Sequence, residues 1–373
     1  MTPPTQPPGG PSTNGSRLDV TVRVVGTGLL GASLGLALTA NGLDVALADA
    51  SPSQLHLAID YGAGRAAADD DDPDLIVVAV PPDVVADVVA MELARYPRAV
   101  VTDVASVKTA PYLDLKARGL DLSLYIGSHP MAGRERGGAI SARADLFAGR
   151  PWVICRDKWT PRHALAVIED LALDVGATPI EMTPDQHDEA VGLVSHVPQL
   201  VSSLLAARLV DAPDAALRLT GQGLRDTVRI ASSAPELWVQ ILGANSAPVA
   251  EVLTSLRSDL DAIITALHNP DAVGARRRIA DSIAAGNVGV ARLPGKHGQD
   301  RRFAQIVVMV DDTPGQLGRL LTELGEINVN MEDLRLEHSP GTAVGLAEIS
   351  VLPEVKQRTI DDLEVRGWRI ASV

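Results

Sequence analysis

Residues 20–49 read VTVRVVGTGLLGASLGLALTANGLDVALAD, and this stretch decides the fold that the sequence predicts. It begins with a valine-rich strand that runs directly into a glycine-rich turn at 26–31. A helical pattern follows and ends at Gly42, and a second strand at 45–48 ends in Asp49. A strand, a glycine turn, a helix and a second strand in this order predict one complete βαβ unit.

The turn has the form of a dinucleotide-binding loop. The residues expected to contact the cofactor there are Gly26, Thr27, Gly28, Leu29, Leu30 and Gly31. Gly26 permits the tight turn, Gly28 lets the backbone approach a pyrophosphate, and Gly31 lets the helix pack closely on the strand. Asp49 follows Gly28 by 21 positions, close to the spacing of about 20 for a residue that binds the ribose 2′-hydroxyl and repels a 2′-phosphate. The sequence therefore predicts NAD rather than NADP, and the full context disfavours an ordinary βαβ turn.

Composition limits the class of protein. The 373 residues are enough for two or three domains. A net charge of −14, without a basic patch, argues against a nucleic-acid partner. The single cysteine, Cys155, fits a reducing compartment, and its apolar surroundings predict a buried structural thiol. Residues 1–18 are rich in Pro, Gly, Ser and Thr, which predicts a disordered tail rather than a signal peptide. We expect no apolar run long enough to span a bilayer, and a cytoplasmic location.

The first domain is expected at 19–183. Strand-like runs recur at 75–80, 99–103, 125–127 and 152–155, with helical stretches between them. This alternation predicts an α/β Rossmann-type domain, a mostly parallel sheet with helices on both faces. Ligands bind outside the carboxyl ends of such strands, so Val80 and Pro81 are expected beside the cofactor.

Two further domains are expected after residue 183. Helical patterns alone fill 184–285, with an apolar stripe from Val249 to Leu267, and predict an all-α domain that contributes to the substrate site and to a homodimer. Residues 286–302 lack periodicity and predict a linker. Residues 303–373 follow the order βαββαβ, which predicts a small ferredoxin-like module with a turn at 339–341.

Candidate site residues follow two of the predicted strands. His129 lies in SHPMAG (128–133) and Ser106 lies in DVASVK (103–108). An isolated histidine is more often a surface or core residue. At a strand's carboxyl end in a cofactor-binding domain, however, His129 is well placed for proton transfer near pH 7.

Polar residues also gather at the start of the helical domain. His187 and Asp188 are followed by His196 and Gln199. The two histidines are nine positions apart on one helix, which is not the i, i+4 spacing of zinc ligands. No metal site is therefore predicted.

Two arginines further along point to an anionic ligand. Arg225 and Arg229 are four positions apart and share one helix face. Together they would clamp a dianion such as a dicarboxylate. The alternative is a solvated basic face paired with Asp226 and Glu236.

These motifs in their order resemble the prephenate dehydrogenase family, including its arogenate-using relatives, over about residues 20–285. The matching segments are 26–34, 103–108, 128–133, 187–198 and 223–238. The terminal module resembles an ACT domain through DDTPGQL (311–317) and INVN (327–330). Each segment is a moderate signal, and the ordered set is highly specific.

The resemblance implies oxidative decarboxylation of prephenate to 4-hydroxyphenylpyruvate in tyrosine biosynthesis, with hydride transfer to NAD. It implies that His129 accepts the proton of the ring hydroxyl and that Ser106 orients His129. Arg229 corresponds to the substrate-carboxylate arginine of the family, and Arg225 stands where a cationic residue is found. The substrate-binding residues implied in this way are Arg229, Arg225, His187, Asp188, His196, Gln199, Arg134 and Trp238.

Two positions depart from better-known members of the family. Gln199 stands where many relatives have a second histidine, and Arg134 replaces a common threonine. Both are expected to face the substrate. An additional arginine favours the more anionic substrate, so we expect prephenate rather than arogenate.

Three other functions stay open. Arogenate dehydrogenase carries out the same chemistry on an amino-acid substrate. A general NAD-dependent hydroxyacid or imine reductase would leave the paired arginines and the terminal module unexplained. A non-catalytic NAD or amino-acid sensor would have no need of a proton acceptor such as His129.

The terminal module is expected to bind an aromatic amino acid, tyrosine, and to inhibit the enzyme. Gly315 and the amides that open the following helix are suited to a carboxylate. The predicted effector-binding residues are Asp311, Thr313, Gly315, Gln316, Leu317 and Asn328.

Overall fold

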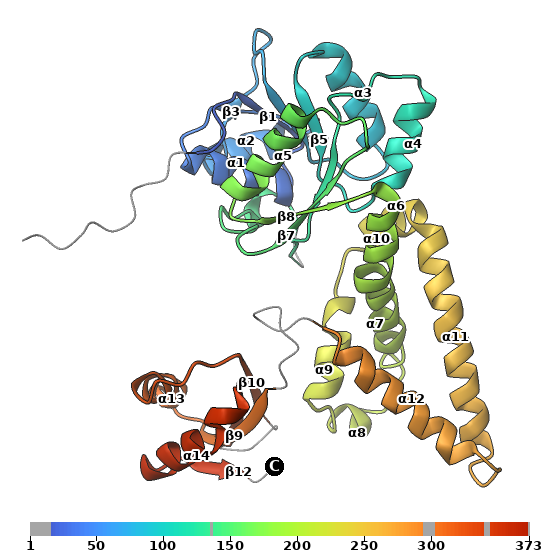
Figure 1. Cartoon of the computed structure of the whole chain (residues 1–373), viewed down its shortest axis with the longest axis vertical. Coiled ribbons are helices and arrows are strands. Elements are labelled where there is room, and N and C mark those ends of the chain that lie inside the picture. Colours follow the sequence, from blue (N-terminus) through green and yellow to red (C-terminus); the bar gives the residue numbers. More distant parts are fainter. Residues whose placement is uncertain (1–15, 135–136, 294–302, 339–343, 372–373) are drawn as a thin grey trace, which may run out of the picture. The chain divides into compact units, whose positions relative to one another are not determined.

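The computed structural model describes residues 16–134, 137–293, 303–338 and 344–371 (Figure 1). The chain divides into two compact units, one made of residues 1–207 and 230–254 and the other of residues 208–229 and 255–373. The helical region contributes to both units. The three-domain division expected from the sequence stays a prediction.

The first unit contains a five-stranded parallel sheet. Its strands are β1 (Val22–Val25), β2 (Val45–Ala48), β3 (Arg65–Ala66), β4 (Leu75–Val78) and β5 (Val100–Asp103), in the order β3-β2-β1-β4-β5. Val22 pairs with Val45 on one side and with Leu75 on the other. The predicted Rossmann-like parallel sheet is therefore confirmed.

Helices cover both faces of this sheet. They are α1 (Leu29–Ala40), α2 (Pro52–Asp60), α3 (Val85–Arg95), α4 (Thr109–Ala117) and α5 (Arg162–Asp174). Alternate side chains of β4 enter different cores, because successive residues of a strand point to opposite faces. Leu75 and Val77 pack in a core with residues of α1, α2 and α5, whereas Ile76 and Val78 pack with residues of α3 and α4.

A three-stranded sheet continues the unit. It consists of β6 (Gly127–Pro130), β7 (Pro151–Cys155) and β8 (Thr178–Met182), with β6 antiparallel and β8 parallel to β7. The strand expected at 125–127 begins later, because residues 127–130 pair with β7. His129 thus lies within a strand, opposite Val153, and not after one. Cys155 is buried as predicted.

The N-terminal boundary also differs from the expectation. Residues 1–15 of the predicted tail lie outside the described residues. Leu18 donates its amide hydrogen to the Asp174 carboxylate at 3.1 Å, and the Ser16 hydroxyl donates to the same carboxylate. Residues 16–18 therefore belong to the folded unit, because Asp174 at the end of α5 binds them.

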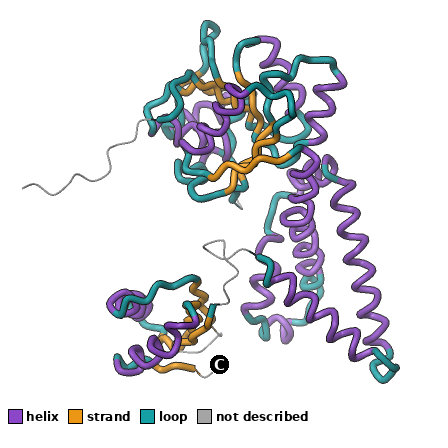
Figure 2. Tube along the Cα trace, viewed as in Figure 1, coloured by secondary structure: helices purple, strands orange, loops and turns teal. Residues whose placement is uncertain are grey.

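Helices fill the region after β8, and Figure 2 shows that the strands lie in the segments before and after it. The elements are α6 (Pro184–Val191), the π-helical turn η2 (Gly192–His196), α7 (Val197–Ala207), α8 (Asp214–Leu217), α9 (Gln222–Val228), η3 (Arg229–Ala231), α10 (Pro235–Ala244), α11 (Ser246–His268) and α12 (Ala275–Val290). Residues 286–290 of the predicted linker are helical, and residues 294–302 lie outside the described residues.

One helical run is more apolar than the sequence analysis expected. Residues 184–207 are continuous from α6 through α7, and by length and mean hydropathy they are long and apolar enough to cross a membrane. Only 33% of the most apolar 18-residue segment of this run is buried. His187, Asp188 and His196 on this run are nevertheless buried, as is typical of a helix packed within a protein. Length and composition alone do not make a membrane span.

The terminal module has its own sheet and core. Its elements are β9 (Ala304–Asp311), α13 (Gln316–Glu326), β10 (Asp333–His338), β11 (Val344–Val351), α14 (Lys356–Val365) and β12 (Arg369–Ala371). The strands form an antiparallel sheet in the order β10-β11-β9-β12. Ile306, Val308 and Leu320 are among its buried core residues. The turn predicted at 339–341 lies outside the described residues.

Candidate active site

The glycine loop between β1 and α1 is shaped by close packing. A Cβ atom at Gly31 would lie 1.9 Å from the carbonyl oxygen of Gly26, and one at Gly26 would lie 2.4 Å from the carbonyl oxygen of Ala79. The predicted role of Gly31 in close helix–strand packing is confirmed. At Gly28 a Cβ atom would meet no described atom within 4 Å. The N-terminus of α1 therefore has open space beside it, as an approaching pyrophosphate requires.

The acidic residue after β2 is held by the same loop. Oδ2 of Asp49 accepts hydrogen bonds from the amide of Thr27 at 2.6 Å and from its hydroxyl at 2.8 Å. Oδ1 accepts from the amide of Ser51 at 2.8 Å. Thr27 is fully buried, and its hydroxyl orients Asp49, while its predicted contact with the cofactor stays a prediction. The predicted contact between Asp49 and a ribose stays a prediction.

The remaining predicted cofactor residues lie around this loop. Leu29 and Leu30 open α1. Val80 and Pro81 follow β4, and a Cβ atom at Gly26 would lie 3.0 Å from Cγ1 of Val80. Val80 thus borders the loop at the carboxyl edge of the sheet, where ligands of this fold bind.

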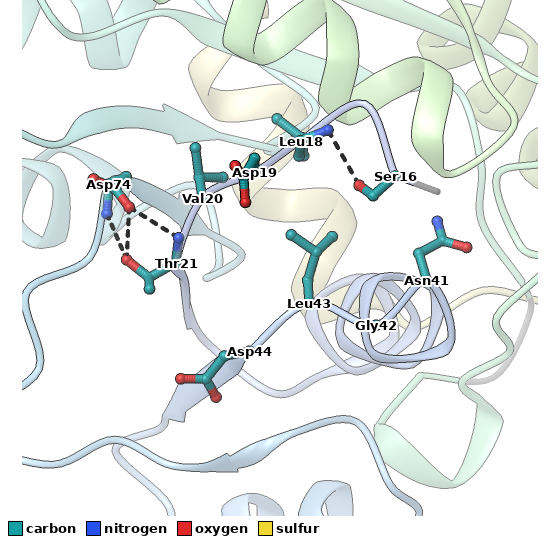
Figure 3. Close-up of a pocket in the computed structure, with 10 residues that line it drawn as sticks. All are labelled: Ser16, Leu18, Asp19, Val20, Thr21, Asn41, Gly42, Leu43, Asp44 and Asp74. Carbon is teal, nitrogen blue, oxygen red and sulfur yellow. Dashed lines mark hydrogen bonds between the residues drawn. The ribbon is translucent and has the colours of Figure 1, made fainter. Parts of the chain in front are cut away.

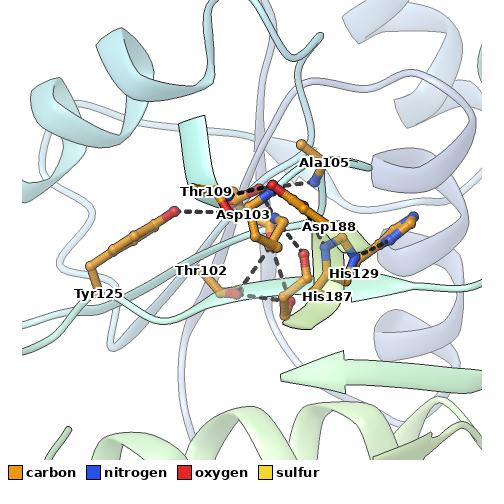
Figure 4. Close-up of polar contacts among 10 residues, drawn as sticks. Thr102, Asp103, Ala105, Thr109, Tyr125, His129, His187 and Asp188 are labelled. Atoms are coloured by element: carbon orange, nitrogen blue, oxygen red, sulfur yellow. Dashed lines mark hydrogen bonds and ion pairs between the residues drawn. The ribbon is translucent and has the colours of Figure 1, made fainter. Parts of the chain in front are cut away.

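A chain of three buried side chains runs through the unit (Figure 4). Nδ1 of His187 lies 2.7 Å from Oδ1 of Asp188, and Nε2 of His187 lies 2.8 Å from Nδ1 of His129. An ionised carboxylate only accepts hydrogen bonds, so His187 carries its hydrogen on Nδ1 and accepts at Nε2. His129 must then donate from Nδ1, which leaves the lone pair of its Nε2 available. We call Asp188, His187 and His129 the histidine relay.

The first residue of α4 and the residue before it hold the relay's carboxylate. The amide of Lys108 donates to Oδ1 of Asp188 at 2.9 Å, and the amide of Thr109 donates to Oδ2 at 2.8 Å. Burial works to raise the pKa of Asp188, but the hydrogen bonds from His187 and from these amides outweigh it and lower the pKa. Asp188 is therefore a stable anion at the N-terminus of a helix.

A second buried polar group lies directly beside the relay. The ammonium of Lys108 contacts the Asp103 carboxylate and donates to the carbonyl oxygen of Ser128 at 2.7 Å, immediately before His129. The hydroxyl of Tyr125 donates to Asp103 at 2.7 Å. Burial, followed by the charge of Asp103, raises the pKa of Tyr125 well above its usual value. These residues fix the backbone that carries His129.

His129 is kept neutral by its surroundings. Its pKa lies well below 6.5, first because of burial and then because of the nearby groups His187, Lys108 and His196. A neutral imidazole with a free Nε2 lone pair is a hydrogen-bond and proton acceptor. The site can thus remove a proton from a bound hydroxyl group.

His196 belongs to a separate hydrogen-bonded group. The side-chain amide nitrogen of Asn245 lies 2.8 Å from the carbonyl oxygen of Asp188 and 3.0 Å from Nδ1 of His196. The ring of Trp238 contacts the His196 ring edge-on, with centroids 5.9 Å apart. Gln199 is buried, and its amide makes long contacts of 3.4 Å with the hydroxyls of Ser203 and Ser233.

Lys108, Asp103 and Asn245 were missed as functional residues by the sequence analysis. Lys108 and Asp103 lie in the DVASVK segment, where a lysine and an aspartate flanking an apolar stretch were the available signal. Asn245 follows α10 without any motif of its own. Its position became evident only from its two contacts.

Several predicted residues are not joined to the relay by the contacts described above. Ser106 is half-buried in the loop after β5. Arg134 donates to the carbonyl oxygen of Ser141 at 3.3 Å, within its own loop. Arg225 and Arg229 are exposed and belong to the other compact unit. Their contacts with the substrate stay predictions.

The predicted effector residues lie at the two ends of the terminal sheet. Five of them lie at the end of β9 or just after it, whereas Asn328 precedes β10, whose first residue is level with the start of β9. Gly315 has a φ of 91° and caps the N-terminus of α13, which Gln316 and Leu317 begin. The amide of Thr313 donates to the carbonyl oxygen of Asp311 at 2.8 Å. Asn328, with a φ of 55°, adopts the left-handed conformation. Gly315 thus adopts the left-handed conformation as well, and binding of an effector stays a prediction.

A hollow of about 600 Å³ lies in the first unit. Figure 3 shows that its lining comes from the segment before β1, the α1–β2 turn and Asp74. Thr21 and Asp74 bond to each other across it, and Asp19 and Asp44 add negative charge. This hollow is at the amino ends of the strands, opposite to the edge where such sheets bind ligands. Across the part of the chain that the structure describes, no three His, Cys, Asp or Glu side chains gather as metal ligands.

A parallel Rossmann-like sheet with a tightly packed glycine loop, together with a buried neutral histidine, defines a nucleotide-dependent dehydrogenase. The chain matches the prephenate dehydrogenase nucleotide-binding domain over residues 34–181 and the prephenate dehydrogenase dimerization domain over residues 183–278. It belongs to the prephenate dehydrogenase family.

Relatives support this membership along most of the chain. A protein named as a probable prephenate dehydrogenase of Streptomyces niveus is 36% identical over 93% of this chain and 98% of its own length. A cyclohexadienyl dehydrogenase of Zymomonas mobilis is 29% identical over 67% of this chain and 89% of its own length.

Solved structures agree with the fold. The Synechocystis arogenate dehydrogenase is 28% identical and has a TM-score of 0.59, covering 72% of this chain and 99% of that one. The Aquifex aeolicus prephenate dehydrogenase, in complex with hydroxyphenyl propionate and NAD+, is 24% identical with a TM-score of 0.65. It covers 74% of this chain and 100% of that one.

Proposed function

We propose that this enzyme catalyses the NAD-dependent oxidative decarboxylation of prephenate to 4-hydroxyphenylpyruvate, a step of tyrosine biosynthesis. The observation that carries the proposal is the histidine relay, which leaves Nε2 of a neutral His129 as a proton acceptor. Hydride leaves a carbinol carbon more readily as its oxygen loses a proton, so an oriented base is what this reaction needs.

The glycine loop and Asp49 would hold NAD, which would supply the hydride acceptor when bound. His129 takes the proton of the ring hydroxyl while the carbon–hydrogen bond at that carbon breaks. The carbon–carbon bond to the ring carboxylate then breaks, CO2 leaves, and its electron pair makes the ring aromatic. The proton returns from His129 to the phenol oxygen, so the histidine ends the cycle neutral.

The relay stabilises the transient positive charge. When His129 is protonated, its Nδ1 hydrogen still points to His187, and His187 still points to the anionic Asp188. Attraction between these groups is strong because all three are buried. The low resting pKa of His129 favours return of the proton, whereas stabilisation by the anionic Asp188 favours its uptake.

Arg229 and Arg225 are proposed to bind the substrate carboxylates. Their four-residue spacing, and their place at positions where the family has substrate cations, support this role. Arg229→Ala should chiefly raise the KM for prephenate, and Arg218→Ala, at an exposed arginine outside these motifs, should not. A large fall in kcat with an unchanged KM would contradict this assignment. Ser106 is proposed to orient His129 and the ring hydroxyl.

Prephenate is proposed over arogenate as the substrate. Arg134 adds positive charge in the loop after β6, and prephenate is the more anionic of the two molecules. Both substrates should be compared with NAD and with NADP in one set of steady-state measurements. We expect the highest kcat/KM for prephenate with NAD. A higher kcat/KM for arogenate would make the enzyme an arogenate dehydrogenase, and no turnover of either substrate would refute the function.

The enzyme is proposed to be a homodimer. Its match to a dimerization domain covers α11, and the apolar residues Leu256, Leu260, Ile264 and Leu267 along this helix are exposed in the single chain. A stripe of exposed leucine and isoleucine on a long helix is typical of a subunit interface. Light scattering of the full chain should give twice the mass of one chain.

The terminal module is proposed to be an ACT-like regulatory domain that binds tyrosine and inhibits the enzyme. Its βαββαβ order and its antiparallel sheet are those of ferredoxin-like modules. The left-handed Gly315 presents the amides that open α13 to a carboxylate. Deleting residues 303–373 should leave turnover and abolish inhibition by tyrosine, and unchanged inhibition would refute the regulatory role.

A cytoplasmic location is proposed from the state of the one cysteine. Burial raises the pKa of Cys155 to about 12, so the thiol stays protonated and unreactive. A free thiol of this kind is typical of proteins in a reducing compartment. Fractionation of producing cells should recover the protein with the other biosynthetic enzymes of the cytoplasm.

A further inference from the structure

Asn245 connects the histidine relay to the second buried histidine. Asn245 is buried. Its Nδ2 atom makes two contacts, one with the carbonyl oxygen of Asp188 and one with Nδ1 of His196. Asp188 therefore begins two hydrogen-bonded chains. Its carboxylate leads through His187 to His129, and its main-chain carbonyl leads through Asn245 to His196.

The orientation of the Asn245 amide follows from its first partner. A main-chain carbonyl oxygen can only accept, so the atom 2.8 Å from it must be the NH2 group. An NH2 group can only donate, so Nδ1 of His196 accepts the second hydrogen bond at 3.0 Å. A neutral His196 must then carry its hydrogen on Nε2.

The two histidines thus have opposite polarity at Nε2. The relay gives His129 a lone pair there, whereas the Asn245 amide gives His196 a hydrogen there. Prephenate has the matching groups, because its single hydroxyl donates and its carboxylate and keto oxygens accept.

We propose that Asn245 is a positioning residue that holds His196 as the Nε2–H tautomer, so that the substrate site offers an acceptor at His129 and a donor at His196. The proposal rests on the proposed function and deepens it. His129 meets the ring hydroxyl, and His196 donates to a carboxylate or keto oxygen of the same substrate. His196 is consequently a binding group and not a second base.

The charges around His196 support a neutral donor. Burial lowers the pKa of His196 to about 4, the charge of Asp188 works to raise it, and His187 works to lower it. The ring of Trp238 covers one edge of the imidazole and carries no charge. His129, whose pKa is influenced by His196, is itself neutral. The donor therefore keeps the same form between pH 5 and 8.

Nitrogen NMR of the histidine rings in the ligand-free full chain tests the tautomer directly. His196→Gln assigns the resonances of this ring by their disappearance. We expect a hydrogen on Nε2 and a bare Nδ1. A hydrogen on Nδ1 would overturn the inference even if the enzyme turns over prephenate, so the proposed function and this proposal can fail separately.

Asn245→Asp tests the consequence for the substrate. An aspartate accepts from Nδ1 of His196, so the neutral ring turns its Nε2 lone pair toward the substrate oxygen, and the pKa of His196 rises. We expect the KM for prephenate to rise by about tenfold or more at high pH. At low pH the KM should approach that of the wild type, because a protonated His196 again donates. The kcat should change by only a few-fold.

Asn41→Asp is the matched control. The Asn41 side-chain amide also donates to a main-chain carbonyl, that of Asp174 at 2.8 Å, but it touches no histidine. The control should keep the wild-type KM at every pH. If Asn245→Asp fails to fold, Asn245→Ala should give a mixture of His196 tautomers and a pH-independent rise in KM. An unchanged His196 tautomer and KM in both Asn245 variants would refute the proposal.

Discussion

The glycine loop and the histidine relay lie in the same compact unit, but they are built in opposite ways. The loop is made of backbone from a few consecutive residues, and its glycines are required because neighbouring carbonyl oxygens leave no room for a Cβ atom. The relay is made of side chains, and its hydrogen bond from His129 to His187 joins residues 58 positions apart. The loop can be recognised from local spacing, whereas the relay exists only after β6 and α6 have come together.

The loop and the relay also differ in their roles, because the loop is suited to cofactor binding and the relay to proton transfer. The loop offers open space and amides beside Gly28, which suits a cofactor that every dehydrogenase of this class binds. The relay determines which nitrogen of His129 can accept a proton. Changes in the loop should therefore affect the cofactor and folding, and changes in the relay should affect turnover.

The largest effect is expected when the relay loses its base. His129→Asn should lower kcat by about 10²- to 10⁴-fold, because an amide cannot take up the hydroxyl proton. The KM for prephenate and the binding of NAD should change little. His163→Asn, on the exposed side of α5, is the control and should keep full activity. Steady-state kinetics with kcat unchanged in His129→Asn would remove His129 from the mechanism.

The next largest effect concerns packing in the loop. Gly31→Ala should reduce the free energy of unfolding by about 1–3 kcal/mol, because the new methyl group would meet the Gly26 carbonyl oxygen. Gly28→Ala should leave the free energy of unfolding nearly unchanged and raise the KM for NAD, because its Cβ atom would enter the cofactor space. Urea unfolding and NAD titration of both variants measure this difference. Equal stability of the two variants would contradict the packing argument.

A smaller effect is expected at the acidic residue that the loop holds. Asp49→Ser should shift the ratio of kcat/KM for NAD to that for NADP by about tenfold or more toward NADP, because a charge that repels the 2′-phosphate is removed. Asp44→Ser provides a control, because Asp44 is exposed and bonds to Arg65 instead. If the ratio of kcat/KM for NAD to that for NADP stays the same in Asp49→Ser, Asp49 does not discriminate between the two cofactors at the ribose.

The last prediction concerns folding and not turnover, and its variable is the pH. His129 and His196 both have lowered pKa values in the folded protein. Below about pH 6.5 the unfolded chain binds protons on them that the folded chain does not, so stability falls as the pH falls. Each histidine contributes a slope of about 1.4 kcal/mol per pH unit, until the pH reaches its folded pKa.

Unfolding measured between pH 7 and pH 4.5 tests this slope. His196→Gln should lower it by the share of one histidine over this range, because its folded pKa is about 4. His163→Gln, at an exposed histidine, should leave the slope unchanged. An identical slope in the wild type and in His196→Gln would mean that His196 titrates normally in the folded chain.

The order of elements could be predicted from the sequence because each element depends on nearby residues. Valine-rich strands, the glycine spacing and the alternation of strands with helices predicted the parallel sheet, and the βαββαβ order of the last seventy residues is present in the structure. The strand that contains His129 was expected too early. Its position depends on pairing with β7, and β7 lies more than twenty residues further on.

The candidate site was only half predictable for the same reason. His129, His187, Asp188 and His196 were identified from motifs, but nothing in the sequence paired the first two or linked the fourth to Asn245. Buried lysines are rare, and only the contacts of Lys108 with Asp103 and Ser128 reveal why one is tolerated here.

The sequence by itself determined the class of fold, the cofactor loop and the family, because these depend on short-range spacing and on the order of local motifs. Only the tertiary structure decided which nitrogen of each histidine carries a hydrogen. That choice depends on what the far side of each ring touches, and those partners, a histidine backed by a carboxylate for His129 and an amide for His196, come from distant parts of the chain.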